Sequence, residues 1–466
     1  MARVLPAEEE GSNARRIPPI MVRPPVDGGK SRPVTPGTEI GVGLLGFGAV
    51  GAQVYRLLEE GAERIARRTG WRPTVRRIAV LDPARPRPHP LPAHLLAPDA
   101  AAVVGDPQVE VVVEVMGGLE PARTLVLEAL RRGKAVVTAN KRLLATHGAE
   151  VYSAAAAAQA PLAFEGAVGG AIPIVKPLRE TLAADRVRVV EGILNGTTNF
   201  VLTRMTRDGW SFGDALAEAQ RRGFAEADAT EDVGGHDAAA KLAILASLAF
   251  DAALTDADVF REGIQEVAPR DIAYARELGY VVKLLAVGRD LGEAVDVRVH
   301  PALIPQTHPL ATVEEERNAI MVVGERAGPL VLSGPGAGGA ATAAVVVGDI
   351  LDAAGRRRRG SGEAAPALRP AGAPTRRPVR PVEDLVIPYY FGLQVTDRPG
   401  VFARVAAVFG EEEVSIASIV QKSRGAVADV VLLTHEAREA AVRRVVARLR
   451  AMDVVKSVDS VIRVVE

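Results

Sequence analysis

Residues 40–55, IGVGLLGFGAVGAQVY, decide the fold of the first domain. An apolar strand pattern runs into a Gly-x-Gly-x-x-Gly turn, and a helical pattern begins directly after it. The first glycine permits a tight turn, the second lets the backbone approach a diphosphate, and the third allows close packing of the helix on the strand. The diphosphate would lie on the helix N-terminus, where amides and the helix dipole favour negative charge. The residues predicted to bind a dinucleotide here are Gly46, Phe47, Gly48, Val50 and Gly51.

The strand predicted over residues 77–82 ends in an acid, which suits a ribose hydroxyl of the dinucleotide. The polar stretch 61–73 before it is expected to be an inserted loop. Leu81, Asp82 and Arg85 are predicted to lie at the adenosine end. Because Arg85 and Arg87 could instead neutralise a 2′-phosphate, the choice between NAD and NADP stays open.

Two further strand patterns end in small residues. Residues 109–115 lead into Met116-Gly117-Gly118, and residues 135–138 lead into Ala139-Asn140-Lys141. In a parallel sheet these ends line a ligand crevice at one edge. We therefore predict that Gly117 and Lys141 face the bound ligand.

Residues 219–242, AQRRGFAEADATEDVGGHDAAAKL, place a set of carboxylates ahead of one lysine, Lys241, at the start of an apolar run. Asp237 and Lys241 are four residues apart and share one face of a helix. A half-buried lysine near carboxylates is a tunable proton donor, and the acids can hold an ammonium group of a ligand. A polar loop that caps a helix is the structural alternative. The carboxylates are Glu226, Asp228, Glu231, Asp232 and Asp237.

Composition limits the function further. A chain of 466 residues should form two or three domains. Its 57 basic and 57 acidic side chains balance, which gives no electrostatic case for nucleic acid. The absence of cysteine excludes disulfides and thiol catalysis. We expect no membrane span, because the sequence lacks an apolar run of about twenty residues. The acidic, proline-rich N-terminus is unlike a secretory signal, so a cytoplasmic protein is expected.

The chain divides at two stretches of low apolar content, 1–38 and 355–384; the second holds eight arginines and five prolines. A glycine-rich turn before a helix near residue 340 should return the chain to the first domain. The last 80 or so residues alternate as βαββαβ, a ferredoxin-like order. The predicted fold class is α/β, with a disordered extension (1–38), a Rossmann-type doubly wound nucleotide-binding domain (39–160, completed by 334–354), an α+β substrate and dimerisation domain (161–333), a linker (355–384) and a ferredoxin-like domain (385–466).

Several motifs together identify a family. They are GLLGFGAVG at 43–51, EVMGGLEPA at 114–122, GKAVVTANK at 133–141, EGAVGGAIPI at 165–174, GILNGTTNF at 192–200, the acidic stretch extended to 219–245, GPGAGGAAT at 334–342 and TDRPGVFARVA at 396–406. In this order they closely resemble homoserine dehydrogenase of the bacterial type with a C-terminal ACT domain. The resemblance runs from about residue 40 to the end, broken by the linker.

The resemblance implies reversible, NAD(P)-dependent interconversion of L-homoserine and L-aspartate 4-semialdehyde, on the route to threonine, methionine and isoleucine. It implies an amino-acid effector, threonine, bound at the ACT domain near Asp397–Gly400, and a homodimer or homotetramer. The resemblance assigns catalysis to Lys241, Lys141 and Asp237, and substrate binding to Glu226, Asp232, Asn195, Gly196, Thr197 and Thr198. It assigns backbone contacts near the cofactor to Gly223 and Gly338. It assigns a monovalent cation, Na⁺ or K⁺, to Glu165, Val168, Gly170 and Ile172.

Three departures from the family pattern and two rival functions matter. Leu81 stands where the family commonly has an arginine for the NADP phosphate, which weakens the inference of NADP; Ala229 and Ala171 are milder replacements. A 2-hydroxy-acid dehydrogenase with an ACT domain would use a histidine–carboxylate pair. A catalytically silent amino-acid sensor would be expected to lose Lys141 or Lys241, and both are present.

Overall fold

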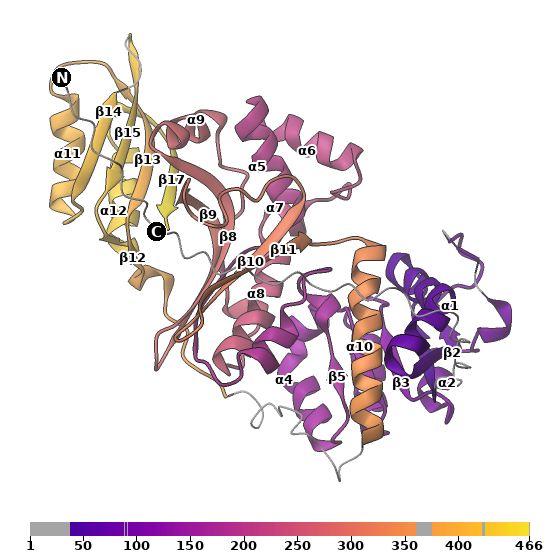
Figure 1. Cartoon of the computed structure of the whole chain (residues 1–466). Helices are drawn as coiled ribbons and strands as arrows, with labels where there is room; N and C mark the ends of the chain where they lie inside the picture. The colour runs from indigo at the N-terminus through magenta and orange to yellow at the C-terminus, as the bar shows by residue number, and fades with distance from the viewer. Residues whose placement is uncertain (1–37, 88, 91, 360–374, 422–424, 466) are drawn as a thin grey trace, which may run out of the picture.

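The computed structural model describes residues 38–87, 89–90, 92–359, 375–421 and 425–465. The N-terminal extension predicted over 1–38 lies outside this part of the chain except for Thr38, and so does the centre of the predicted linker. Three bodies follow one another in Figure 1, with the first domain at one end, the ACT-type domain at the other, and the substrate domain between them.

The first domain is built on a parallel sheet of five strands in the order β2-β1-β3-β4-β5. Its central strands are buried on both faces, which is why they read as continuous apolar runs rather than as alternating ones. The helix after the glycine turn extends to Thr69, so the predicted loop at 61–73 is wrong: its first part is helical and the rest begins β2. The strands are β1 (Thr38–Leu45), β2 (Trp71–Ala79), β3 (Val111–Glu114), β4 (Ala135–Thr138) and β5 (Leu162–Ala163).

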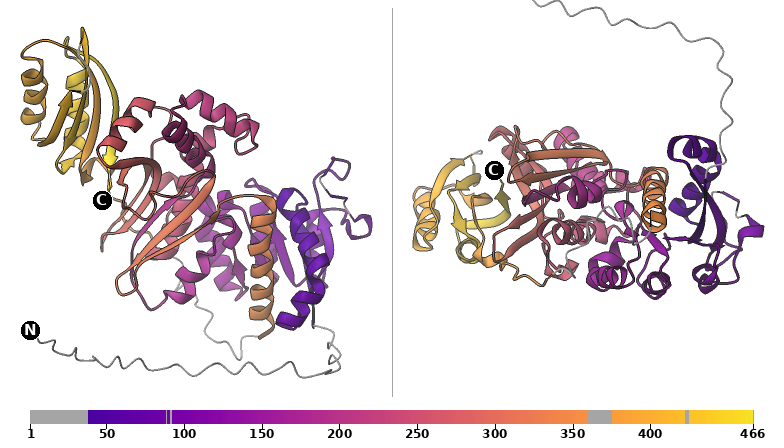
Figure 2. Two further views of the ribbon diagram at one scale, coloured as in Figure 1. Left: turned by 45° about the horizontal axis from the view of Figure 1, so that its top comes forward. Right: turned by 60° about the horizontal axis from the view of Figure 1, so that its bottom comes forward.

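Helices cover the two faces of this sheet. One face packs on α1 and α10, and the other packs on α2, α3 and α4. The late helix α10 thus returns to the first domain across the sheet, as Figure 2 shows from two sides. Five of its residues belong to the segment predicted as linker, and Arg356 and Arg358 there form ion pairs with Glu180 and Glu110. The helices are α1 (Ala49–Thr69), α2 (Ala100–Gly105), α3 (Ala122–Arg131), α4 (Lys141–Ala157) and α10 (Gly339–Arg359).

The substrate domain is a mixed sheet with α5 and α8 on one face. Its strands are ordered β11-β10-β6-β8-β9, and these neighbours are antiparallel. Helix α8 also packs on α4, so the two domains meet along these helices. The elements are β6 (Val187–Ile193), α5 (Gly196–Asp208), α6 (Phe212–Arg221), α7 (Thr230–Val233), α8 (His236–Phe250), β7 (Phe260–Arg261), α9 (Pro269–Glu277), β8 (Tyr280–Asp290), β9 (Val295–Pro305), β10 (Arg317–Gly324) and β11 (Gly328–Pro335).

The C-terminal domain has the predicted βαββαβ order with two short added strands. Its sheet runs β17-β13-β15-β14, and β17 also pairs in parallel with β9, so the two sheets are continuous. The segment before it, from residue 375, packs on the substrate domain, where Arg377 donates to the Phe250 carbonyl at the end of α8 (2.8 Å). The elements are β12 (Val386–Ile387), β13 (Tyr389–Thr396), α11 (Val401–Glu411), β14 (Ile416–Gln421), β15 (Val427–Thr434), β16 (Ala437–Arg438), α12 (Glu439–Arg450) and β17 (Val455–Val464).

No helix among the described residues is both long enough and apolar enough to span a membrane.

The glycine turn gives a first test. A Cβ on Gly51 would lie 2.3 Å from the Gly46 carbonyl oxygen, which belongs to the backbone and cannot swing away. We expect Gly51→Ala to lower the free energy of unfolding by about 1–3 kcal/mol and to weaken nucleotide binding. Differential scanning calorimetry and nucleotide titration measure the two effects.

Gly61→Ala is the matched control, because Gly61 lies in the same helix and its Cβ would make ordinary van der Waals contacts, with the end of Arg64 at 3.4 Å and with the Ile65 side chain at 3.5 Å. This variant should keep or raise the Tm, since alanine favours helix more than glycine. Equal losses in both variants would contradict the close-packing argument.

Candidate active site

Two helices from different domains bring the predicted lysines together. Asn140 caps α4 by accepting from the Leu143 amide at 3.0 Å, which fixes Lys141 as the first residue of the helix. Lys141 forms an ion pair with one oxygen of Asp237 on α8. The other oxygen of Asp237 lies 2.8 Å from the ammonium of Lys241. One carboxylate is therefore shared by two lysines across the domain boundary.

Lys241 is held deep in the substrate domain. It is 7% exposed, and its ammonium donates to the Leu194 carbonyl at 2.7 Å as well as to Asp237. An ammonium has three N–H donors. Two are used by these contacts, so the third can serve an oxygen atom of a ligand.

The opposite charges in this cluster shift the pKa values of their partners so that the ionised forms are favoured. Burial alone would raise the pKa of Asp237, but Lys241 and Lys141 outweigh it and hold this pKa well below its usual range. Burial likewise opposes the charge on Lys141, yet Asp237, Asp232 and Glu231 raise its pKa overall. Asp237 is therefore ionised, and Lys141 is protonated, at neutral pH.

A second carboxylate, Asp232, joins the cluster through Asn195. The side-chain nitrogen of Asn195 donates to Asp232 at 2.7 Å and to Asp237 at 2.9 Å. The side-chain oxygen of Asn195 accepts from the backbone N–H of Thr198 at 2.8 Å and so caps α5. Thr197 adds a hydroxyl donor to Asp232 at 3.1 Å. Burial raises the pKa of Asp232, and nearby Asp237 adds to the effect.

The glycine turn has the shape of a phosphate cradle. Gly46 has a φ of +105°, and a Cβ there would lie 2.7 Å from the Val115 carbonyl oxygen. Gly48 stands at the N-cap of α1, and a Cβ on it would meet nothing within 4 Å, so the approach to the helix N-terminus is open. Gly339, next to Gly338, lies against the Ala49 backbone, so the second glycine turn adjoins the first. The described residues fit a dinucleotide diphosphate at this place.

The predicted adenosine end is an exposed loop. Strand β2 ends at Ala79, and the Leu81 side chain after it is fully exposed. Asp82 accepts from the Ala84 amide at 2.8 Å, and Arg87 donates to backbone carbonyls of the same loop, including that of Arg85 at 2.7 Å. The turn at Gly117 is held by Glu114, which accepts from the Met116 amide at 2.9 Å and from the Gly117 amide at 3.3 Å.

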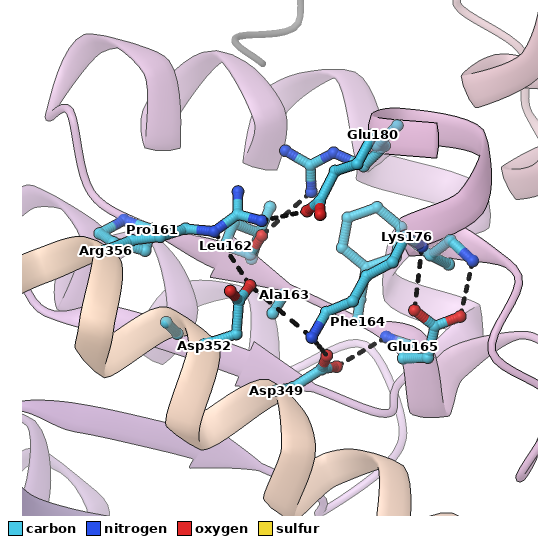
Figure 3. A pocket seen from close by; sticks show the side chains of 13 residues that line it. Pro161, Leu162, Ala163, Phe164, Glu165, Lys176, Glu180, Asp349, Asp352 and Arg356 are labelled. Atoms are coloured by element: carbon cyan, nitrogen blue, oxygen red, sulfur yellow. Dashed lines mark hydrogen bonds and ion pairs between the residues drawn. The ribbon is translucent and has the colours of Figure 1, made fainter. Parts of the chain in front are cut away.

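The predicted cation residues form a buried loop beside α10. Glu165 accepts from the amides of Val175 and Lys176 at 2.6 and 3.0 Å, and its own amide donates to Asp349 at 2.8 Å. Figure 3 shows these carboxylates in a small pocket lined by residues of the segments 161–165 and 175–180 and of α10. Burial raises the pKa of Asp349 to about 7 and also raises the pKa of Glu165. In the part of the chain that is described, no cluster of three or more histidine or acidic side chains could hold a metal.

Other predicted residues lie at the surface, and some contributors were missed. Glu226 is exposed between α6 and α7, where its carbonyl accepts from Gln220 at 3.1 Å, and Gly223 is exposed too. The missed residues are Glu114, a buried acid inside an apolar strand, and Asn318 on β10, which shares the Leu194 carbonyl with Lys241 at 2.9 Å. The acid in the VVVE strand was a signal for Glu114; nothing local marked Asn318.

The rival that uses a histidine–carboxylate pair finds no support in this cluster. Among the described residues such a contact joins His308 and Glu191 at 3.5 Å, and it includes none of the clustered acids or lysines.

A phosphate-cradling turn in one domain and a lysine–carboxylate cluster at the boundary with the next define a nucleotide-dependent dehydrogenase, here followed by an ACT-type domain. Family models match accordingly: homoserine dehydrogenase over residues 173–351, the NAD-binding domain of homoserine dehydrogenase over 46–165, and the ACT domain over 389–453. The chain belongs to the homoserine dehydrogenase family, whose members are NAD(P)-dependent oxidoreductases acting on the CH–OH group of homoserine.

Individual relatives agree over nearly the whole length. The homoserine dehydrogenase of Corynebacterium glutamicum is 46% identical over 435 residues, covering 92% of this chain and 96% of the relative. The crystal structure of a homoserine dehydrogenase from Thiobacillus denitrificans is 39% identical with a TM-score of 0.85, covering 92% of this chain and 99% of that one. A hyperthermophilic archaeal homoserine dehydrogenase in complex with NADPH is 26% identical with a TM-score of 0.56, covering 68% and 98%.

The pocket of Figure 3 predicts an unusual pH dependence of stability. Because the folded state keeps the Asp349 proton up to about pH 7 while the unfolded chain loses it near pH 4, this group's contribution is present below about pH 4 and is lost as pH rises to about 7. Asp349→Asn keeps an acceptor for the Glu165 amide and cannot ionise. Its urea midpoint should therefore fall less than that of the wild type between pH 5 and pH 8.

Asp352→Asn is the control, because Asp352 lines the same pocket but is about one-quarter exposed. It should keep the wild-type slope. A slope unchanged by Asp349→Asn would show that Asp349 ionises normally in the folded protein.

Proposed function

We propose that this chain interconverts L-homoserine and L-aspartate 4-semialdehyde through the cluster of Lys141, Asp237 and Lys241. The observation that carries the proposal is the position of Lys241: buried, charge-paired with Asp237 and left with one N–H donor to spare. The family membership supports the reaction, and the open glycine turn supports the nucleotide.

Lys241 handles the proton in this proposal. A bound nicotinamide supplies or accepts the hydride at C4 of the substrate. In reduction, the free N–H of Lys241 points to the aldehyde oxygen, stabilises its growing negative charge and then donates the proton. In oxidation, the same amine takes the proton back from the hydroxyl group. Asp237 keeps both ammonium groups in place, and Lys141 adds a second positive charge at the cofactor side.

The two ends of the substrate need opposite charges. Its ammonium suits the acids Asp232 and Glu226, the second by swinging in from its exposed loop. Its carboxylate suits the N-terminus of α5, where Gly196, Thr197 and Thr198 begin a helix of 13 residues. This places the C4 end of the substrate toward Lys241.

A monovalent cation, Na⁺ or K⁺, is proposed at residues 165–172. Its ligands would be the backbone carbonyls of Val168, Gly170 and Ile172 together with Glu165. Of the two Glu165 oxygens, one accepts two amides and the other accepts that of Lys176, which leaves this second oxygen room for a cation. Such oxygen ligands suit hard cations, and bound there the ion would brace the loop against α10.

The ACT domain is proposed to bind threonine, and the chain to form a homodimer or homotetramer. The turn at Asp397–Gly400 starts α11, with Gly400 at a φ of +86° as its N-cap. The edge strand β11 exposes Leu330 and Val331, an apolar pair that a second copy of the chain can cover. Size-exclusion chromatography with light scattering tests the assembly.

The role of Lys241 is tested by substitution. Lys241→Ala should abolish turnover, by at least about 10³-fold, and leave nucleotide binding nearly intact, because the glycine turn belongs to the other domain. Stopped-flow turnover and fluorescence titration with reduced nucleotide measure the two effects. Lys241→Arg keeps the charge but cannot release a proton at neutral pH, so it should also be inactive. Wild-type turnover in Lys241→Arg, or parallel loss of nucleotide binding in Lys241→Ala, would contradict the assignment.

The activity itself is tested by initial rates with L-homoserine, comparing NAD with NADP. We expect oxidation with at least one nucleotide, stimulation by Na⁺ or K⁺ over a tetramethylammonium control, and inhibition by L-threonine. A matched 2-hydroxy acid should give no turnover. If neither nucleotide supports the oxidation of homoserine, the proposed function is rejected.

A further inference from the structure

Residues 260–277 form a segment that we call the strap. It contains β7 and α9 and connects the region after α8 to β8. The strap contacts the acidic turn of the active site on one side and the ACT domain on the other, and the chemistry above makes no use of it.

The ACT domain holds the first end of the strap through one buried arginine. Arg463 on β17 is 3% exposed, and its guanidinium contacts both oxygens of Glu262 at 2.5 and 3.1 Å. The same guanidinium donates to Glu439 on α12 at 2.9 and 2.7 Å. Forked contacts of this kind fix direction as well as distance. Arg463 therefore ties Glu262 to the core of the ACT domain.

The other end of the strap is held as well. Asp271 on α9 is 1% exposed and accepts from the Tyr390 hydroxyl on β13 at 3.0 Å. Arg270 beside it forms an ion pair with Asp459 on β17. Both ends of the strap are thus fastened to the sheet of the ACT domain.

The middle of the strap supports the acidic turn. The Ile264 amide donates to the Val233 carbonyl at 3.0 Å, and Ile264 itself is fully buried. A Cβ on Gly263 would lie 2.4 Å from the same carbonyl oxygen, so the two backbones touch. Val233 ends α7 directly after Asp232, and Asp237 follows four residues later at the start of α8. The strap therefore sets the position of the turn that carries both acids.

We propose that Glu262 and Arg463 are positioning residues for the substrate pocket: the ACT domain fixes the strap, and the strap holds the turn that carries Asp232, the proposed ligand of the substrate ammonium, and Asp237, the partner of the two lysines. This inference rests on the proposed oxidation of homoserine. A change in the strap should leave nucleotide binding unaltered, because the atoms packed around Gly46 and Gly51 belong to the first domain and not to the strap.

The choice of variant follows from burial. Removing Arg463 would take from the buried Glu439 the more buried of its two arginine partners and leave it only Arg443, a change that can destabilise the ACT domain. The Glu262 side chain is 43% exposed, and Glu262→Gln removes only the charge that crosses between the domains. Glu412→Gln is the matched control, because Glu412 also contacts two arginines, Arg444 and Arg448, but wholly within the ACT domain.

The experiment compares the KM for homoserine, kcat and the Kd for reduced nucleotide. Glu262→Gln should raise the KM for homoserine about 3- to 10-fold, an effect typical of losing a charge-assisted contact, with the nucleotide Kd within 2-fold of the wild type as roughly the error of titration. Glu262→Asp, which keeps the charge, should recover most of the KM. In a double-mutant cycle, Arg463→Lys should add little to Glu262→Gln.

Three results would overturn the inference: an unchanged KM in Glu262→Gln, an equal change in the nucleotide Kd, or the same rise of KM in Glu412→Gln. If the wild type oxidises no homoserine, the proposed function fails, and hydrogen exchange then decides about the strap. Faster exchange at residues 230–237 in Glu262→Gln than in the wild type would support the strap's role, and identical exchange would refute it.

Discussion

The sharing of Asp237 by two lysines is the constraint on which the site depends. Lys141 comes from the first domain and Lys241 from the second, so the carboxylate is fully paired only when α4 and α8 are packed together. A buried carboxylate without its partners would be strongly unfavourable. The charges that surround the proposed proton donor therefore also hold the two domains together at their boundary.

The path of the chain also brings residues to the boundary between the first domain and the substrate domain. Helix α10 returns across the first domain and sets its glycine turn against the N-terminus of α1, while Asn195 and Leu194 at the end of β6 hold the acids and Lys241. Apart from Lys241, which lies inside α8, these contributors are at the ends of strands or helices, where backbone and side chains are free to face a ligand. Chemistry is thus concentrated where regular structure stops, and rigid elements fix it in space.

Periodicity and motifs predicted the glycine turn, the parallel strands, the acidic helix start and the βαββαβ tail, because each depends on residues near one another in sequence. Long-range pairings were not predictable in this way. The loop proposed at 61–73 proved to be mostly the end of α1, since its spaced apolar residues pack on the sheet. Asn318 reaches the Leu194 carbonyl from 124 residues away, and Arg463 reaches Glu262 from 201 residues away. No local pattern encodes such contacts.

The junction of the two sheets bears on how a C-terminal domain can influence distant chemistry. Strands β17 and β9 pair over only two residue positions, Arg463 with Ala302 and Val464 with Leu303. So short a ladder has few hydrogen bonds to resist rotation of one domain on the other. The charged contacts of the strap lie beside this ladder, because Arg463 takes part in both: it pairs with Ala302 in the ladder, and its guanidinium binds Glu262. Directional contacts of this kind add to the few hydrogen bonds of the ladder. A displacement of β17 at Arg463 therefore acts on β9 and on Glu262 together, and the strap connects Glu262 to the Val233 carbonyl, directly after Asp232.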